Sequence, residues 1–150
     1  MDRKYNMEMK STAQFTIFIL AILFQACMGT DPKKDEMIGK WVSSDGATLK
    51  INKDGTFTSE DLPAEYFSFY VKKEDVSGKK VNGVGKWRLE KSQGRWEVTL
   101  DFEEMNKIKK GGNYFVLVSG STGILENNPP WYLFEWVEQE GGKRYRFEKK

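Results

Sequence analysis

Short runs of alternating apolar and polar residues recur along the chain after residue 37. Such a period of two is typical of a β-strand with one face in the core and the other in water. The run over residues 47–52 ends in Asn52-Lys53-Asp54-Gly55, which supplies the residues of a hairpin turn. In the clearest run, apolar Trp96, Val98, Leu100 and Phe102 alternate with polar Glu97, Thr99, Asp101 and Glu103.

Three further runs near the C-terminus also indicate strands. Residues 114–118 and 131–137 are apolar on both faces, so we expect central strands, or strands whose second face meets a ligand or a helix. In the last run, Tyr145 and Phe147 alternate with charged residues, which predicts an exposed final strand protected from edge pairing by its charges.

About eight strands joined by short turns predict an all-β domain over residues 38–150. An antiparallel meander of this kind closes into a small barrel or a strongly curved sheet, because closure removes the unpaired strand edges. A β-sandwich is the alternative architecture. The chain shows no internal repeat long enough for a solenoid.

The first 26 residues differ sharply from this pattern. Residues 1–12 are polar and include Arg3, Lys4 and Lys10, and residues 15–24 then form an almost unbroken apolar stretch. This order is typical of a secretory signal peptide. The apolar stretch is much shorter than the roughly 20 residues of a permanent membrane helix, so an uncleaved anchor is the weaker interpretation.

The end of this segment, Leu23-Phe24-Gln25-Ala26-Cys27, resembles the signal of bacterial lipoproteins. The resemblance implies diacylglyceryl transfer to Cys27, removal of residues 1–26 and a membrane anchor. Met28 follows the cysteine instead of Asp, which implies an outer-membrane destination on the periplasmic or surface face. An ordinary secretory signal cut near Ala26 and a buried structural cysteine are the alternatives. Residues 27–37 are polar and are expected to form a tether.

A second resemblance lies at the start of the predicted domain. Ile38-Gly39-Lys40-Trp41 is similar to the opening of lipocalin-like proteins, and Gly-Lys-Trp recurs at residues 85–87. The resemblance implies a barrel with Trp41 packed across one end and an interior that holds a small apolar ligand.

Composition excludes several kinds of chemistry. The chain has 24 Lys and Arg against 22 Asp and Glu, and the signs are interleaved, which argues against nucleic-acid binding. Histidine is absent, which excludes a Ser-His-Asp triad and histidine ligation of a metal. Asp101 and Glu103 form the most suggestive carboxylate pair, but on a face predicted to be exposed. We therefore expect a protein that is not an enzyme and has no metal or cofactor.

The candidate binding residues are Trp131, Tyr132, Glu135 and Trp136. Trp and Tyr are enriched at binding hot spots, and Glu135 interrupts an aromatic strand in which burial would be costly without a partner. Exposure of Glu135 on the outer face is the simpler explanation. Two functions follow: binding of a small apolar ligand in the barrel, or, alternatively, binding of another envelope protein as an assembly factor, inhibitor or immunity protein.

Overall fold

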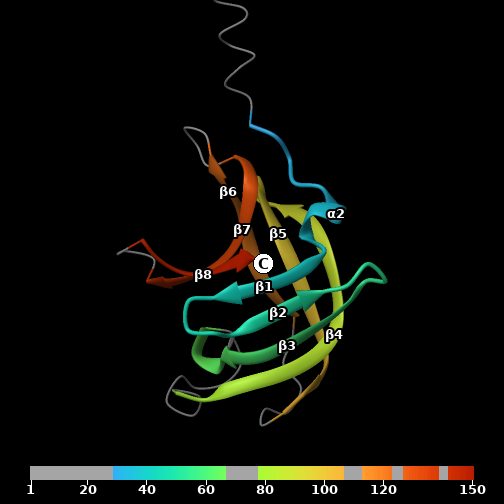
Figure 1. The fold of residues 1–150 in the computed structure, drawn as a ribbon, viewed down its shortest axis with the longest axis vertical. Coiled ribbons are helices and arrows are strands. Elements are labelled where there is room, and N and C mark those ends of the chain that lie inside the picture. The colour runs from blue at the N-terminus through green and yellow to red at the C-terminus, as the bar shows by residue number, and fades with distance from the viewer. Residues whose placement is uncertain (1–28, 67–77, 107–112, 123–126, 139–141) are drawn as a thin grey trace, which may run out of the picture. The chain divides into compact units, whose positions relative to one another are not determined.

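The domain is a closed antiparallel barrel of eight strands, which confirms the predicted all-β meander (Figure 1). The computed structural model describes residues 29–66, 78–106, 113–122, 127–138 and 142–150. Each strand pairs with the next along the chain, and β8 pairs with β1 to close the barrel. The elements are α2 (Lys34–Met37), β1 (Gly39–Ser43), β2 (Thr48–Ile51), β3 (Thr56–Pro63), η1 (Ala64–Tyr66), β4 (Lys80–Ser92), β5 (Arg95–Met105), β6 (Asn113–Thr122), β7 (Asn128–Glu138) and β8 (Lys143–Lys149).

Local sequence explains two of the hairpin turns. In the β2–β3 turn, the Asp54 carboxylate accepts a hydrogen bond from the Thr56 backbone N–H at 3.0 Å, and Gly55 takes a φ of 88°. In the β4–β5 turn, Gln93 and Gly94 have φ values of 48° and 79°. The two successive positive φ values of the β4–β5 turn suit the right-handed twist of the flanking strands. In the β2–β3 turn Gly55 alone has a positive φ, and the Asp54 side chain stabilises the turn.

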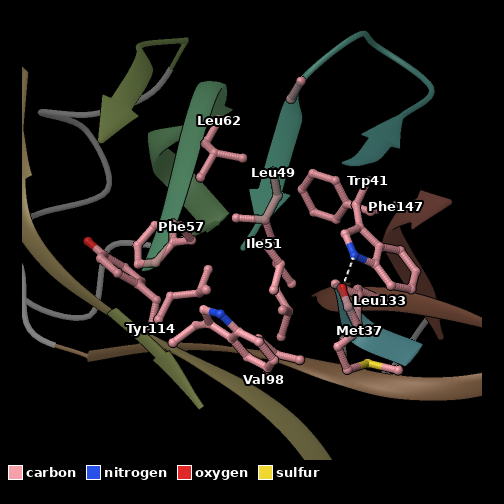
Figure 2. Close-up of a cluster of buried hydrophobic side chains, with 14 of the residues drawn as sticks. Met37, Trp41, Leu49, Ile51, Phe57, Leu62, Val98, Tyr114, Leu133 and Phe147 are labelled. Carbon is pink, nitrogen blue, oxygen red and sulfur yellow. Dashed lines mark hydrogen bonds between the residues drawn. The ribbon is translucent and has the colours of Figure 1, made fainter. Parts of the chain in front are cut away.

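Alternating side chains from all eight strands fill the interior with one hydrophobic cluster (Figure 2). Across it, the ring of Phe102 stands edge-on to Phe57 at 4.8 Å and to Tyr114 at 5.1 Å, measured between centroids. Space for these rings comes from β4, where a Cβ added to Gly83 would lie 2.5 Å from the Phe102 ring. Glycine at this inward position therefore lets two aromatic side chains meet over β4.

One end of the barrel is closed by α2, and we call it the α2 end. Met37 and Trp41 are fully buried there, and the Trp41 indole N–H donates to the Met37 carbonyl at 2.7 Å (Figure 2). The Lys149 ammonium donates to the Glu36 carbonyl at 2.6 Å, which ties α2 to the end of β8. Trp41 thus packs across one end of the barrel, as expected.

The second Gly-Lys-Trp triplet places its tryptophan at the same end. Trp87 is 5% exposed, and its indole N–H donates to the Asn52 carbonyl in the β2–β3 turn at 2.8 Å. The Lys34 ammonium lies 5.3 Å from the centroid of the Trp87 ring. The short helix therefore spans from the end of β8 to β4.

The folded unit begins at Asp31, seven residues before the predicted boundary at Ile38. Pro32 is buried and Met37 belongs to the core, so residues 31–37 are part of the domain instead of a free tether. The sequence did not predict the burial of Pro32 and Met37, because an isolated apolar residue in a polar segment forms no periodic pattern.

The prediction of an exposed edge at the last strand is wrong. Phe147 faces the core, and β8 pairs with β1 through the register Val42↔Glu148 and Ser43↔Phe147. The alternation along the strand was read correctly, but closure of the barrel leaves β8 hydrogen-bonded on both sides. Its charged side chains face outward without protecting an edge.

Candidate binding surfaces

Strand alternation divides the four candidate residues of β7 into two pairs. Trp131 and Glu135 point inward, on the same face as Leu133 of the core cluster. Tyr132 and Trp136 point outward, where they pack around Phe134. The two pairs therefore belong to two different surfaces, one inside the barrel and one outside it.

Glu135 lies on the inner face, where the sequence favoured exposure on the outer face. It pairs with Tyr145 of β8, which packs against the core, and the register of β6 and β7 sets Val116 on its other side. Burial raises the pKa of the Glu135 carboxyl to about 7, although a hydrogen bond with the Trp136 backbone partly opposes the shift. Because both faces of β7 are apolar, the sequence carried no signal for the direction of Glu135.

Trp131 is the second polar group on the inner face of β7. Its side chain is 8% exposed, and its buried indole nitrogen has no hydrogen-bond partner among the described residues. Trp41 and Trp87 both donate to backbone carbonyls. A buried donor without an acceptor costs free energy, so this N–H is available to a bound acceptor.

Outside the barrel, Tyr132, Phe134 and Trp136 form a row of rings with centroid spacings of 5.7 Å and 5.3 Å. Leu117 of β6 pairs with Phe134 and extends the row across the sheet. Tyr132, Phe134 and Leu117 are buried, and Trp136 is partly exposed. Phe115, the neighbour of these residues on β6, is 37% exposed.

Two arginines of β8 cover this row. The guanidinium of Arg144 lies 4.7 Å from the Phe134 ring and 5.0 Å from the Trp136 ring, and it also donates to the Tyr132 hydroxyl. The guanidinium of Arg146 lies 3.7 Å from the Tyr132 ring. We call Leu117, Tyr132, Phe134, Trp136, Arg144 and Arg146 the outer aromatic face.

Sequence reasoning missed the arginines and Phe134. The available signal was that Arg144 and Arg146 alternate with inward Tyr145 and Phe147, which puts both guanidinium groups on the outside. Their partners on β7 became visible only with the register Trp136↔Arg144 and Phe134↔Arg146. Stacking of arginine on aromatic rings is favourable and keeps the cation at the surface.

Acidic residues flank the other side of the outer aromatic face. Glu97 of β5 pairs with Leu117, and Glu90 lies opposite Glu97 on β4. Burial, followed by the charge of Glu90, raises the pKa of Glu97. Hydrogen bonds from Thr99 and then Arg88 lower the pKa of Glu90. Arg88 pairs with Glu90 at 2.9 Å, so from β4 to β8 the outer surface changes from mixed charges, through the apolar row, to the two arginines of β8.

The other sequence candidates have simpler surroundings. Asp101 and Glu103 are exposed as predicted, and the Lys86 ammonium lies 3.3 Å from the Glu103 carboxylate. Within the described residues, no group of three or more metal-ligating side chains is brought together. No helix in the described part is long and apolar enough to cross a membrane. Cys27 and the predicted signal over residues 1–26 lie outside the described residues.

Comparison with known proteins found no relative of this chain. No protein-family model, curated protein or solved structure matches the chain.

Proposed function

We propose that this protein is a non-enzymatic binding module held on the bacterial outer membrane, at its periplasmic or surface face, by lipid on Cys27. The support is the polar segment, the apolar stretch and the Ala26-Cys27 pair at its end, together with a compact unit that starts at Asp31. Two or more acyl chains bury enough methylene groups to hold a protein on a membrane.

Substitution of the cysteine tests the anchor. In cells fed labelled palmitate, we expect the natural chain to take up label and to sediment with membranes, and we expect Cys27→Ser to do neither. Met28→Ser is the matched control, since it changes the neighbouring residue and keeps the thiol. Label on the Cys27→Ser protein, or its retention in the membrane fraction, would refute the lipid anchor.

We infer that the module binds another envelope protein through the outer aromatic face. The observation that carries this inference is the pair of arginines stacked on a row of rings outside a barrel whose interior is already occupied by its own side chains. Trp, Tyr and Arg dominate binding hot spots because they bury large areas and retain polar groups. The two arginines over the aromatic row favour a partner with an apolar anchor beside carboxylates.

Site-directed photocrosslinking in the envelope tests this surface. We expect a photoreactive residue in place of Trp136 to give a discrete protein adduct, and the same residue in place of exposed Lys50 on β2 to give none. Arg144→Glu should abolish the adduct at position 136, because it reverses the charge that faces the partner. Equal adducts at positions 136 and 50, or no adduct at 136, would contradict the proposal.

The inner pair of β7 supports a second candidate function, the binding of a small, mainly apolar ligand. Trp131 presents a buried donor without a partner among the described residues, and Glu135 presents a carboxyl that stays largely protonated below about pH 7. A few polar groups in an apolar interior are typical of ligand sites. Native mass spectrometry of the full chain should then show a stoichiometric adduct that Trp131→Phe weakens and Trp136→Phe retains. A bare mass for the natural chain would exclude a tightly held ligand.

A further inference from the structure

The chain enters the barrel through a fixed contact at the α2 end. The Asp31 carboxylate accepts hydrogen bonds from the Trp96 indole N–H at 2.7 Å and from the Lys91 ammonium at 3.4 Å. The same ammonium lies 5.4 Å from the Trp96 ring centroid. The hydrogen bond from Trp96 is the largest cause that lowers the pKa of Asp31. Both donors belong to the β4–β5 hairpin, so Asp31 is clamped to one defined place on the barrel.

The distance between this clamp and the proposed lipid is limited by the chain. Cys27 precedes Asp31 by four residues. A chain of that length spans at most about 14 Å even when fully extended. A lipid on Cys27 therefore enters the bilayer close to the β4–β5 hairpin, and the barrel does not hang on a long tether.

We propose, on the basis of the lipid anchor proposed above, that the α2 end rests on the membrane surface and that the opposite end points away from the membrane. The Asp31 clamp sets this orientation, because it fixes the segment that follows Cys27 to the α2 end of the barrel. The outer aromatic face then stands on the side of the barrel, between the two ends.

Two single-cysteine variants of the full chain test the orientation. Lys53→Cys lies in the β2–β3 turn at the α2 end, and Ser44→Cys lies in the β1–β2 turn at the opposite end; both sites are exposed. Cys27 is the only cysteine of the natural chain, and acylation blocks its sulfur, so each variant has one thiol for a fluorophore. The labelled proteins are bound to vesicles of phosphatidylcholine and phosphatidylglycerol that contain a headgroup spin-labelled lipid.

We expect severalfold stronger quenching of the fluorophore at position 53 than at position 44. Equal quenching, or stronger quenching at position 44, would overturn the proposed orientation. Failure of the lipid anchor itself is detected separately. Without the lipid, Cys27 has a free thiol, and the natural chain would take up one fluorophore.

The clamp is tested by substitutions in the same labelled chains. Trp96→Phe keeps the ring and removes the indole donor, and Asp31→Ala removes the acceptor. Each should reduce the difference in quenching between positions 53 and 44, because the barrel can then turn on a longer free segment. Lys143→Ala, at the opposite end, is the control and should leave the difference unchanged. A difference that survives both clamp substitutions in full would overturn the role of the clamp.

Discussion

Replacing Glu135 with glutamine tests whether the inner face of β7 holds a buried carboxyl. The folded-state pKa of Glu135 is about 7, against an ordinary value of 4.5, and burial is the main cause. Because the folded state binds the proton more tightly than the unfolded state, protonation of Glu135 stabilises the fold. This stabilisation is fully present below about pH 4.5 and is lost as the pH rises through 7.

The magnitude follows from the difference between the two pKa values. A difference of about 2.5 corresponds to at most about 3 kcal/mol of unfolding free energy, and the partial exposure of the side chain lowers the effect. Glu135→Gln keeps the shape of the neutral acid and cannot ionise. We therefore expect its unfolding free energy to be close to that of the natural sequence near pH 5 and higher by roughly 1–3 kcal/mol at pH 8.

Urea denaturation of residues 28–150 at several pH values between 5 and 8 measures this difference directly. Other carboxyl groups titrate in both proteins and cancel when the two unfolding free energies are subtracted. Glu103→Gln is the matched control for the chemical change, because Glu103 is exposed on the outer face of β5. A difference between Glu135→Gln and the natural sequence that stays constant from pH 5 to pH 8 would refute the buried carboxyl.

Two further substitutions test the packing of the barrel. Trp41→Phe removes the indole donor to the Met37 carbonyl and should lower the unfolding free energy by about 1 kcal/mol or more, measured by urea denaturation; an unchanged value would contradict a tight α2 contact. Gly83→Ala puts a Cβ 2.5 Å from the Phe102 ring and should cost about 1–3 kcal/mol, whereas Val84→Ala at the exposed neighbouring position should cost less; the reverse order would show that Phe102 does not pack over β4.

Periodicity predicted those strands that have water on one side. Val98, Leu100 and Phe102 are buried and Asp101 and Glu103 are exposed, as their alternation indicates. The same reasoning placed Phe147 on the inner face of β8. It could not show that β8 and β1 pair, because closure depends on the twist accumulated over all eight strands and not on any one of them.

Contacts made by isolated residues could not be predicted from the sequence. Met37 and Pro32 are buried at the start of the domain, but each stands alone among polar neighbours. The Asp31 clamp joins residues 65 positions apart in the chain, at Trp96. Neither the burial of these two residues nor the Asp31 clamp produces a local sequence pattern. Residues 31–37 were therefore predicted to be a tether, although they belong to the folded unit.

Strand β7 shows why the binding site was harder to predict than the fold. Its apolar residues continue on both faces, because the inner face meets the core and the outer face meets the arginines of β8. The sequence of such a strand does not show which side chains point inward. Sequence analysis therefore treated Trp131, Tyr132, Glu135 and Trp136 as a single set of candidates.

The two faces of β7 now make the candidate functions separable. Substitutions of Trp131 or Glu135 change only groups that point into the barrel, and substitutions of Trp136 or Arg144 change only groups on its outside. A protein partner should therefore respond to the outer substitutions and tolerate Glu135→Gln, whereas an interior ligand should respond to Glu135→Gln and tolerate Arg144→Ala. If both sets of substitutions abolished the same interaction, the effect would come from loss of the fold, and the unfolding measurements would reveal it.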